Sequence, residues 1–430
     1  MEKKTILLGL NELNFDYIGF YANKGLLPNF KKVFDDYGYI ETTSEKEYEL
    51  LEPWIQWVTI HTGKDYKEHK IFRLGDIVER KDLKQIFEIA EEKGLTVGAI
   101  SPFNADNRLK NPKFFIPDPW TQTKASGESF VKDVSRAVSQ AVNDNAKESV
   151  SKKSIIAILR TLLKVVKPYS YIEYFKLLIS IKSRVGVKAV VLDKLLGDTF
   201  IQQWKKHQPD FSNLFLNTGA HFQHHYMFNS AAYQGALKNP EWYCPTKQDP
   251  LIEILKEYDS IIGKLLKLNV RLIICTGLHQ KPHKHNTFYW RLSNHSDFLQ
   301  ELEIKGIKKV TPRMSRDFLI EFNSKEDAKI AEKIMETYYS KIDKIKIFTI
   351  DNREKSLFVE LTYSYDIGDN FTINGKKEIM NFEKNVAFVA IKNGEHDPVG
   401  YYADTDKKFE KESESIELKK VFDNIVDAFN

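Results

Sequence analysis

The chain has 430 residues, more than one simple hydrophobic core usually holds, so one large domain with insertions or two domains are expected. Its 42% hydrophobic and 29% charged residues are typical of a globular protein, and a net charge of +4 does not indicate a nucleic-acid-binding protein. Two cysteines are too few for a disulfide framework or a cysteine-rich metal site. Because no apolar run is long enough to span a bilayer or to form a signal peptide, a cytoplasmic protein is predicted, with contact at the inner membrane face left open.

The N-terminal part alternates strands and helices, which predicts a parallel sheet covered by helices. The first strand is apolar almost throughout and stops at Asn11 and Glu12. Ligand crevices of such sheets lie at the carboxyl ends of the strands, so these two side chains are expected at the lip of a site. The expected elements are strands over 5–10, 37–43 and 96–101, and helices over 14–21, from Pro28, and over 82–93.

The stretch from Leu51 to Gly63 combines Glu52, a proline and the tryptophans Trp54 and Trp57. One interpretation is a helix that starts at the proline and buries the tryptophans in the core. The other is a binding site with aromatic platforms, in which a glutamate among aromatic rings would have a raised pKa suited to acid–base catalysis.

Residues 123–207 change character and predict a helical insertion with one apolar and one basic side. The basic side is either the solvated face of a cap or a surface for anionic lipid or a phosphorylated substrate. Its charges are Lys152, Lys153, Arg160, Lys164, Lys167, Lys176, Lys182, Arg184, Lys188 and Lys194.

The sheet pattern then resumes with strands over 212–217 and 270–275 and a helix over 250–268. Each strand is followed by a polar cluster, the first containing His221, His224 and His225 and the second His279 and Lys281. Three strands that each end in polar residues indicate one shared site.

A small α+β subdomain is expected at 306–385, after a loop in which Arg291 either binds a phosphate or forms a structural salt bridge. A strand over 387–391 is expected to return to the core, followed by a turn with His396 and a closing helix over 412–429. The predicted organisation is core 1–122, insertion 123–207, core 208–305, subdomain 306–385 and core 386–430.

The order of these motifs resembles the alkaline phosphatase superfamily and, within it, the type I phosphodiesterase/nucleotide pyrophosphatase branch. The resemblance implies an α/β fold with a doubly wound, helix-covered sheet. It is carried by Ile6-Leu-Leu-Gly-Leu-Asn11, Leu27-Pro-Asn-Phe30, Trp57-Val-Thr-Ile-His-Thr-Gly63 with His69, Asn217-Thr-Gly-Ala-His221, Ile273-Ile-Cys-Thr276 and Gly394-Glu-His-Asp-Pro-Val-Gly400.

The resemblance implies two zinc ions and a Thr or Ser nucleophile, and this chain departs from both. Asn11, Asn217 and Thr276 stand where the family has metal carboxylates, and Glu52 or Pro53 stands where it has the hydroxyl. Amides bind zinc poorly and supply no charge, so a two-zinc site is not expected.

Three arrangements remain open at the crevice. One is a single Zn or Mn ion held by His221, His396 and a third group such as His279 or a carboxylate. The second is metal-free catalysis, with Glu52 as general base and a histidine binding phosphate. The third is an inactive binding scaffold. The candidate residues are Glu12, Glu52, His221 and His396 for catalysis, and Asn11, Trp54, Trp57, Asn217, His225, His279, Lys281 and Arg291 for substrate binding.

The function predicted from these observations is an enzyme that acts on a phosphorylated or nucleotide-sugar substrate. A glycosyl or phosphoryl transferase in surface-polysaccharide or glycolipid assembly is favoured, with an anionic or lipid-linked acceptor at the membrane surface and no nucleic-acid partner. The alternatives are a metal-dependent phosphodiesterase or phosphatase with rearranged ligands, and a binding protein without activity.

Overall fold

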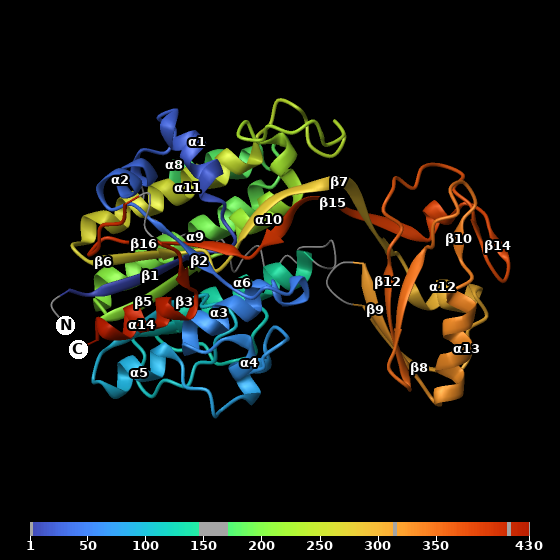
Figure 1. The fold of residues 1–430 in the computed structure, drawn as a ribbon, viewed down its shortest axis with the longest axis horizontal. Helices are drawn as coiled ribbons and strands as arrows, with labels where there is room; N and C mark the ends of the chain where they lie inside the picture. Colours follow the sequence, from blue (N-terminus) through green and yellow to red (C-terminus); the bar gives the residue numbers. More distant parts are fainter. Residues whose placement is uncertain (1–2, 146–170, 313–315, 411–413, 430) are drawn as a thin grey trace. The chain divides into compact units, whose positions relative to one another are not determined.

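The computed structural model describes residues 3–145, 171–312, 316–410 and 414–429 (Figure 1). The chain forms two compact units. Unit 1 contains Met1–Ala236, Pro240–Pro282 and Gly394–Asn430, and unit 2 contains Leu237–Asn239 and His283–Asn393. The chain passes from unit 1 to unit 2 along strand β7 and returns along β15.

Unit 1 is built on an eight-stranded, mostly parallel sheet with the order β17-β2-β16-β6-β1-β5-β3-β4, in which only β16 runs antiparallel to its neighbours. The predicted α/β class and doubly wound sheet are confirmed. The strands are β1 (Thr5–Leu10), β2 (Ile40–Thr43), β3 (Val97–Ile100), β4 (Phe114–Ile116), β5 (Phe211–Leu216), β6 (Arg271–Cys275), β16 (Val399–Asp404) and β17 (Ile416–Glu417).

Helices cover both faces of this sheet, which explains why its central strands are mostly apolar. Ile6, Leu8 and Leu10 of β1 point into one layer and Leu7 into the other, because successive side chains of a strand alternate between faces. The first layer contains α1 (Phe15–Asn23), α2 (Pro28–Asp36), α6 (Ser129–Asn145), α9 (Val187–His207), α10 (Thr218–Tyr226) and α11 (Pro250–Leu265). The second contains α3 (Pro53–Thr62), α5 (Ile86–Glu92) and α14 (Lys419–Asp427).

Two of the predicted elements are corrected by the structure. The helix expected at 82–93 is α5, which begins after Gln85 because Gln85 and Glu88 form a capping box, whereas Asp82 pairs with Arg80. The strand expected at 387–391 is part of β15 (Val386–Asp397), which pairs with β7 (His279–Leu292) in a separate two-stranded sheet. The strand that enters the core is β16.

The described residues of the region expected as a basic helical insertion form mainly three helices, α6, α8 (Tyr171–Ser180) and α9. The helix predicted over 151–178 lies mostly outside the described residues, which resume at α8. The following α9 is one of the helices that cover the sheet, with Leu196, Phe200 and Trp204 in the core. No helix in the described ranges is both long and apolar enough to cross a membrane.

Unit 2 has its own hydrophobic core, formed by residues between Trp290 and Val386. A four-stranded antiparallel sheet, β11-β12-β9-β8, packs against α13, and a three-stranded sheet has the order β10-β13-β14. The subdomain expected at 306–385 lies inside this unit. Its elements are α12 (His295–Glu301), β8 (Ile307–Pro312), β9 (Asp317–Phe322), α13 (Lys325–Met335), β10 (Tyr339–Ser340), β11 (Phe348–Asn352), β12 (Ser356–Leu361), β13 (Ile373–Asn374) and β14 (Glu378–Ile379).

Candidate active site

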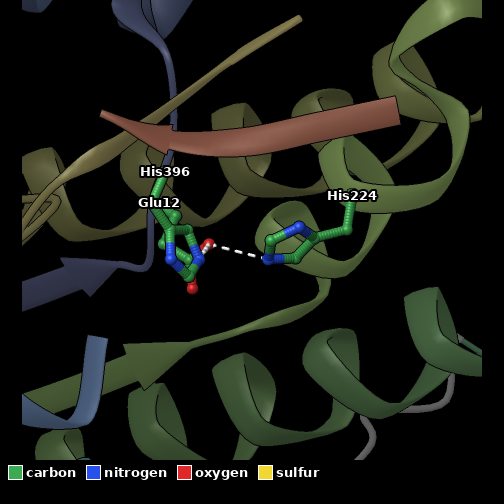
Figure 2. Close-up of side chains that lie close together, drawn as sticks. All are labelled: Glu12, His224 and His396. Atoms are coloured by element: carbon green, nitrogen blue, oxygen red, sulfur yellow. Dashed lines mark ion pairs between the residues drawn. The ribbon is translucent and has the colours of Figure 1, made fainter. Parts of the chain in front are cut away.

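Three ionisable side chains of unit 1 converge at the carboxyl end of the central strands (Figure 2). Glu12 directly follows β1, His224 lies on α10 after β5, and His396 lies at the end of β15. The Oε2 atom of Glu12 is 3.0 Å from Nε2 of His224 and 3.0 Å from Nε2 of His396. The crevice expected from the sequence at the end of the first strand therefore contains a carboxylate between two imidazoles.

The backbone of Glu12 is held in an uncommon conformation that aims its side chain at the histidines. Its φ of 57° lies in the left-handed region, which a residue with a side chain rarely adopts. Its N–H donates to the Thr276 carbonyl (3.0 Å), and its carbonyl accepts from Gln280 N (3.1 Å) and Gln223 Nε2 (2.6 Å). These bonds from the ends of neighbouring strands and from α10 hold the strained residue in place.

The Glu12 carboxyl is ionised although it is 2% exposed. Burial by itself would raise its pKa, but His396 and His224 outweigh this effect and bring the pKa well below its usual range. Asn11 Nδ2 donates to Oε1 (2.8 Å) and Gln280 Nε2 donates to Oε2 (2.5 Å). A buried anion with this many donors needs a cation beside it, either a proton on a histidine or a metal ion.

The three side chains fit a single divalent transition metal. Their ligand atoms all lie within 4.8 Å of one another, and the two closest separations are 3.0 Å. Bonds of about 2.0–2.1 Å to a tetrahedral zinc ion place neighbouring ligand atoms roughly 3.3 Å apart. Two histidines and one carboxylate form a ligand set used by catalytic zinc and non-haem iron sites.

The outer nitrogens of both histidines support this assignment. Nδ1 of His224 lies 3.4 Å from the Gly394 carbonyl, and Nδ1 of His396 lies 3.8 Å from Oε2 of Glu52. A metal-binding histidine commonly directs its second ring nitrogen at a carbonyl or carboxylate, which fixes the tautomer that leaves Nε2 free for the metal.

The residues beside the cluster do not fit a second zinc ion. Oδ1 of Asn11 accepts from Trp57 Nε1 (2.8 Å), and its Nδ2 donates to Oδ1 of Asn217 (2.7 Å). The Thr276 hydroxyl accepts from the backbone N–H of Tyr401 (2.8 Å). All three positions are neutral and their oxygens are engaged in bonds within the protein, so they supply none of the negative charge that two dications require.

The metal ligands proposed from the sequence are assembled only in part. His396 is in the cluster, and Glu12, proposed as catalytic, joins it. His221 is exposed and packs its ring against His225 (4.5 Å between centroids), while Nδ1 of His279 is 2.6 Å from the Val399 carbonyl. Among the described residues, the third group is His224.

The proposed substrate-binding residues lie in different environments. Trp57 is fully buried, as in the core interpretation of this stretch: its ring packs on Gly9, where a Cβ would come within 2.6 Å of it, and its Nε1 donates to Oδ1 of Asn11. Trp54 is half-buried and donates to the Phe72 carbonyl. Lys281 is partly exposed, pairs with Asp397 (3.1 Å) and lies 3.9 Å from Glu395. Arg291 lies on the part of β7 that belongs to unit 2.

His224 is the member of this cluster that the sequence did not single out from its neighbours. Helix α10 contains three histidines within five residues, His221, His224 and His225. Successive residues of a helix point about 100° apart, so only some of these side chains can face Glu12. The signal in the sequence was this group of histidines. Which of them faces Glu12 depends on how α10 packs against the sheet.

Comparison with known proteins returns structural similarity only. No protein-family model and no curated protein matches the sequence. Among solved structures, a phosphonoacetate hydrolase from Sinorhizobium meliloti 1021 is 11% identical, with 100% of this chain and 96% of that chain covered and a TM-score of 0.45. Murine ectonucleotide pyrophosphatase/phosphodiesterase 5 in complex with AMP is 11% identical over 100% and 95% of the chains, with a TM-score of 0.44.

An alkaline phosphatase from the Antarctic bacterium TAB5 is 12% identical over 99% of this chain and 98% of that chain, with a TM-score of 0.40. Two of these solved structures carry names of the family that the sequence motifs resemble. At this level of similarity the likeness concerns the fold and extends to no activity.

Proposed function

We propose that this chain is an enzyme that acts on a phosphorylated small molecule, with one divalent transition metal held by Glu12, His224 and His396. The observation that supports the proposal best is the placement of one carboxylate oxygen 3.0 Å from two imidazole nitrogens, where strands of an α/β sheet end. Two solved structures with a similar fold hold phosphorus oxyanions: phosphonoformate, a phosphonate, in the phosphonoacetate hydrolase, and AMP, a phosphate ester, in the phosphodiesterase.

The metal ion would polarise a phosphoryl oxygen as a Lewis acid. Glu52 is the group beside it that can accept a proton, because its carboxylate is partly exposed and lies 3.8 Å from His396. In the proposed reaction, a hydroxyl oxygen forms a bond to phosphorus, its proton passes to Glu52, and the leaving oxygen departs with the electron pair of the broken P–O bond. The hydroxyl belongs to water in hydrolysis and to a second substrate in transfer.

Metal analysis of the purified full chain tests the site. We expect about one equivalent of zinc, manganese or iron in the parent, and loss of this metal in Glu12→Gln, His224→Ala and His396→Ala. His221→Ala and His279→Ala are the matched controls, because both histidines were candidates from the sequence and lie outside the cluster; they should retain the metal. Equal metal contents in all five variants would refute the assigned ligands.

Turnover separates the functions that share this geometry. The metal-loaded enzyme would be incubated with nucleotide sugars, nucleotides and phosphodiesters in water containing the heavy oxygen isotope, with and without glycolipid or polysaccharide acceptors. Heavy oxygen in the released phosphate indicates hydrolysis. Product formed only with an acceptor supports the glycosyl or phosphoryl transfer favoured from the sequence. If the protein binds one of these compounds but turns over none of them, the proposal of an enzyme is refuted and the alternative of a binding protein without activity remains.

A further inference from the structure

Helix α8 of unit 1 exposes a row of large apolar side chains. Ile172 is 62% exposed, Phe175 64%, Leu178 38% and Ile179 65%. The first, second and fourth are spaced i, i+3 and i+7, so they lie on one side of the helix. We call these four residues the α8 apolar row.

The opposite side of α8 is anchored, so the row is not the result of a detached helix. Tyr174 is 3% exposed, packs in a small core with Val187, Val191 and Leu195 of α9, and donates its hydroxyl to Asp198 Oδ2 (2.9 Å). Isolated exposed apolar residues are ordinary on protein surfaces, but four within one ten-residue helix form a contiguous patch.

Exposed lysines lie on α8 and in the segment that follows it. Lys176, Lys182 and Lys188 are exposed, whereas the acid on α8, Glu173, pairs with Lys194 (3.0 Å). A protein partner could satisfy an apolar row alone, but apolar residues flanked by lysines match the acyl chains and phosphates of an anionic bilayer.

We propose that α8 is a membrane-docking helix, which lies in the plane of an anionic lipid surface. The α8 apolar row enters the boundary between headgroups and acyl chains, and the flanking lysines bind lipid phosphates. This surface is separate from the cluster of Glu12 and the histidines, so the proposal does not depend on the metal or on the reaction.

Co-sedimentation of the full chain with vesicles tests the docking. We expect binding to phosphatidylcholine vesicles that contain phosphatidylglycerol, weak binding to phosphatidylcholine alone, and weaker binding as salt increases. The variant Ile172→Ser/Phe175→Ser/Ile179→Ser should bind at least tenfold more weakly. Lys176→Gln and Lys182→Gln should each weaken binding to the anionic vesicles about fivefold.

The matched control is Ile330→Ser/Ile342→Ser/Met380→Ser, which removes three apolar side chains of unit 2 that are 59–76% exposed and should bind as the parent does. Four outcomes would overturn the proposal. The first is that the parent binds no vesicles, and the second is that the α8 variant binds vesicles as well as the parent does. The third is that, in the absence of vesicles, the α8 variant has a far lower Tm than the control variant. That result would show that other residues of the same chain cover the row. The fourth is that the parent chain is a dimer and the α8 variant is a monomer. That result would identify a second copy of the chain as the partner that covers the α8 apolar row.

Discussion

Glu12 determines the chemistry of the site because its Oε2 atom has two imidazole nitrogens as equal neighbours. Without a metal, both histidines can donate a proton to this oxygen; with a metal, the same three atoms become ligands. The two separations of 3.0 Å suit both states. Because protons compete with the metal ion for these atoms, the metal ion binds more weakly as the pH falls. Metal analysis of variants at Glu12, His224 and His396 therefore tests whether these three side chains bind the metal ion.

At the neighbouring position, Glu52→Gln is expected to retain the metal and lose turnover, because Glu52 contacts His396 and is not a proposed ligand. Removal of a general base lowers kcat by roughly 10²–10⁴-fold. Metal content and kcat measured on the same preparation check this, with Glu12→Gln as the variant that loses both. Turnover equal to the parent would exclude Glu52 from catalysis.

His61 of α3 is expected to make the fold sensitive to acid. It is 1% exposed, packs against the rings of Trp57 and Phe87, and burial lowers its pKa from 6.5 to about 3. Below pH 6.5 the unfolded chain binds a proton at this residue that the folded chain does not, so stability is lost as the pH falls. The loss is about 1.4 kcal/mol of unfolding free energy for each pH unit, down to about pH 3.

Urea unfolding at several pH values checks this effect in His61→Leu. The advantage of the variant over the parent should widen as the pH falls below 6.5. His285→Leu, at an exposed position, is the control. A constant difference between His61→Leu and the parent at all pH values would contradict the expectation.

At the scale of elements, α2 shows how a helix start can depend on a distant residue. The proline at its first position was readable in the sequence, but its N-cap residue, Leu27, makes no side-chain bond. The backbone N–H groups of Asn29 and Phe30 donate instead to Oδ1 of Asp259 on α11, at 2.9 and 2.8 Å.

Asp259→Ala is expected to destabilise unit 1 by about 2 kcal/mol, because it leaves these N–H groups without their charged acceptor in a buried site. Asp259→Asn keeps an acceptor oxygen and should lose less. Chemical denaturation of both variants measures the difference; equal losses would show that the bonds to α2 are not the cause.

At the scale of the whole molecule, each unit has its own core. The two large clusters of unit 1 contain no residue from 283–393, and the cluster of unit 2 lies wholly within that range. Strands β7 and β15, which connect the units, pair with each other, so the two cut ends can be joined by a short linker.

A chain in which a short Gly-Ser linker replaces 283–393 is therefore expected to fold and to retain the metal, because all three ligands lie in unit 1. Circular dichroism melting and metal analysis check this. The same deletion with His224→Ala is the control without a complete ligand set. An unfolded product would show that unit 1 depends on unit 2.

The sequence by itself determined the α/β class and the places where the central strands end, and its amides predicted that a two-zinc site does not form. Strands buried on both faces are mostly apolar, so the change from the apolar run of β1 to Asn11 and Glu12 marks the end of that strand in the sequence alone. Likewise, an amide in place of a carboxylate is a chemical fact that needs no coordinates.

Only the tertiary structure decided which polar residues meet. It selected His224 over its neighbours His221 and His225, because the rotation of α10 on the sheet sets which side chain faces Glu12. It placed His396 beside the start of α3, far away in sequence, and it buried Trp57. These outcomes depend on how elements pack against one another, and the periodicity of a single element carries no information about that packing.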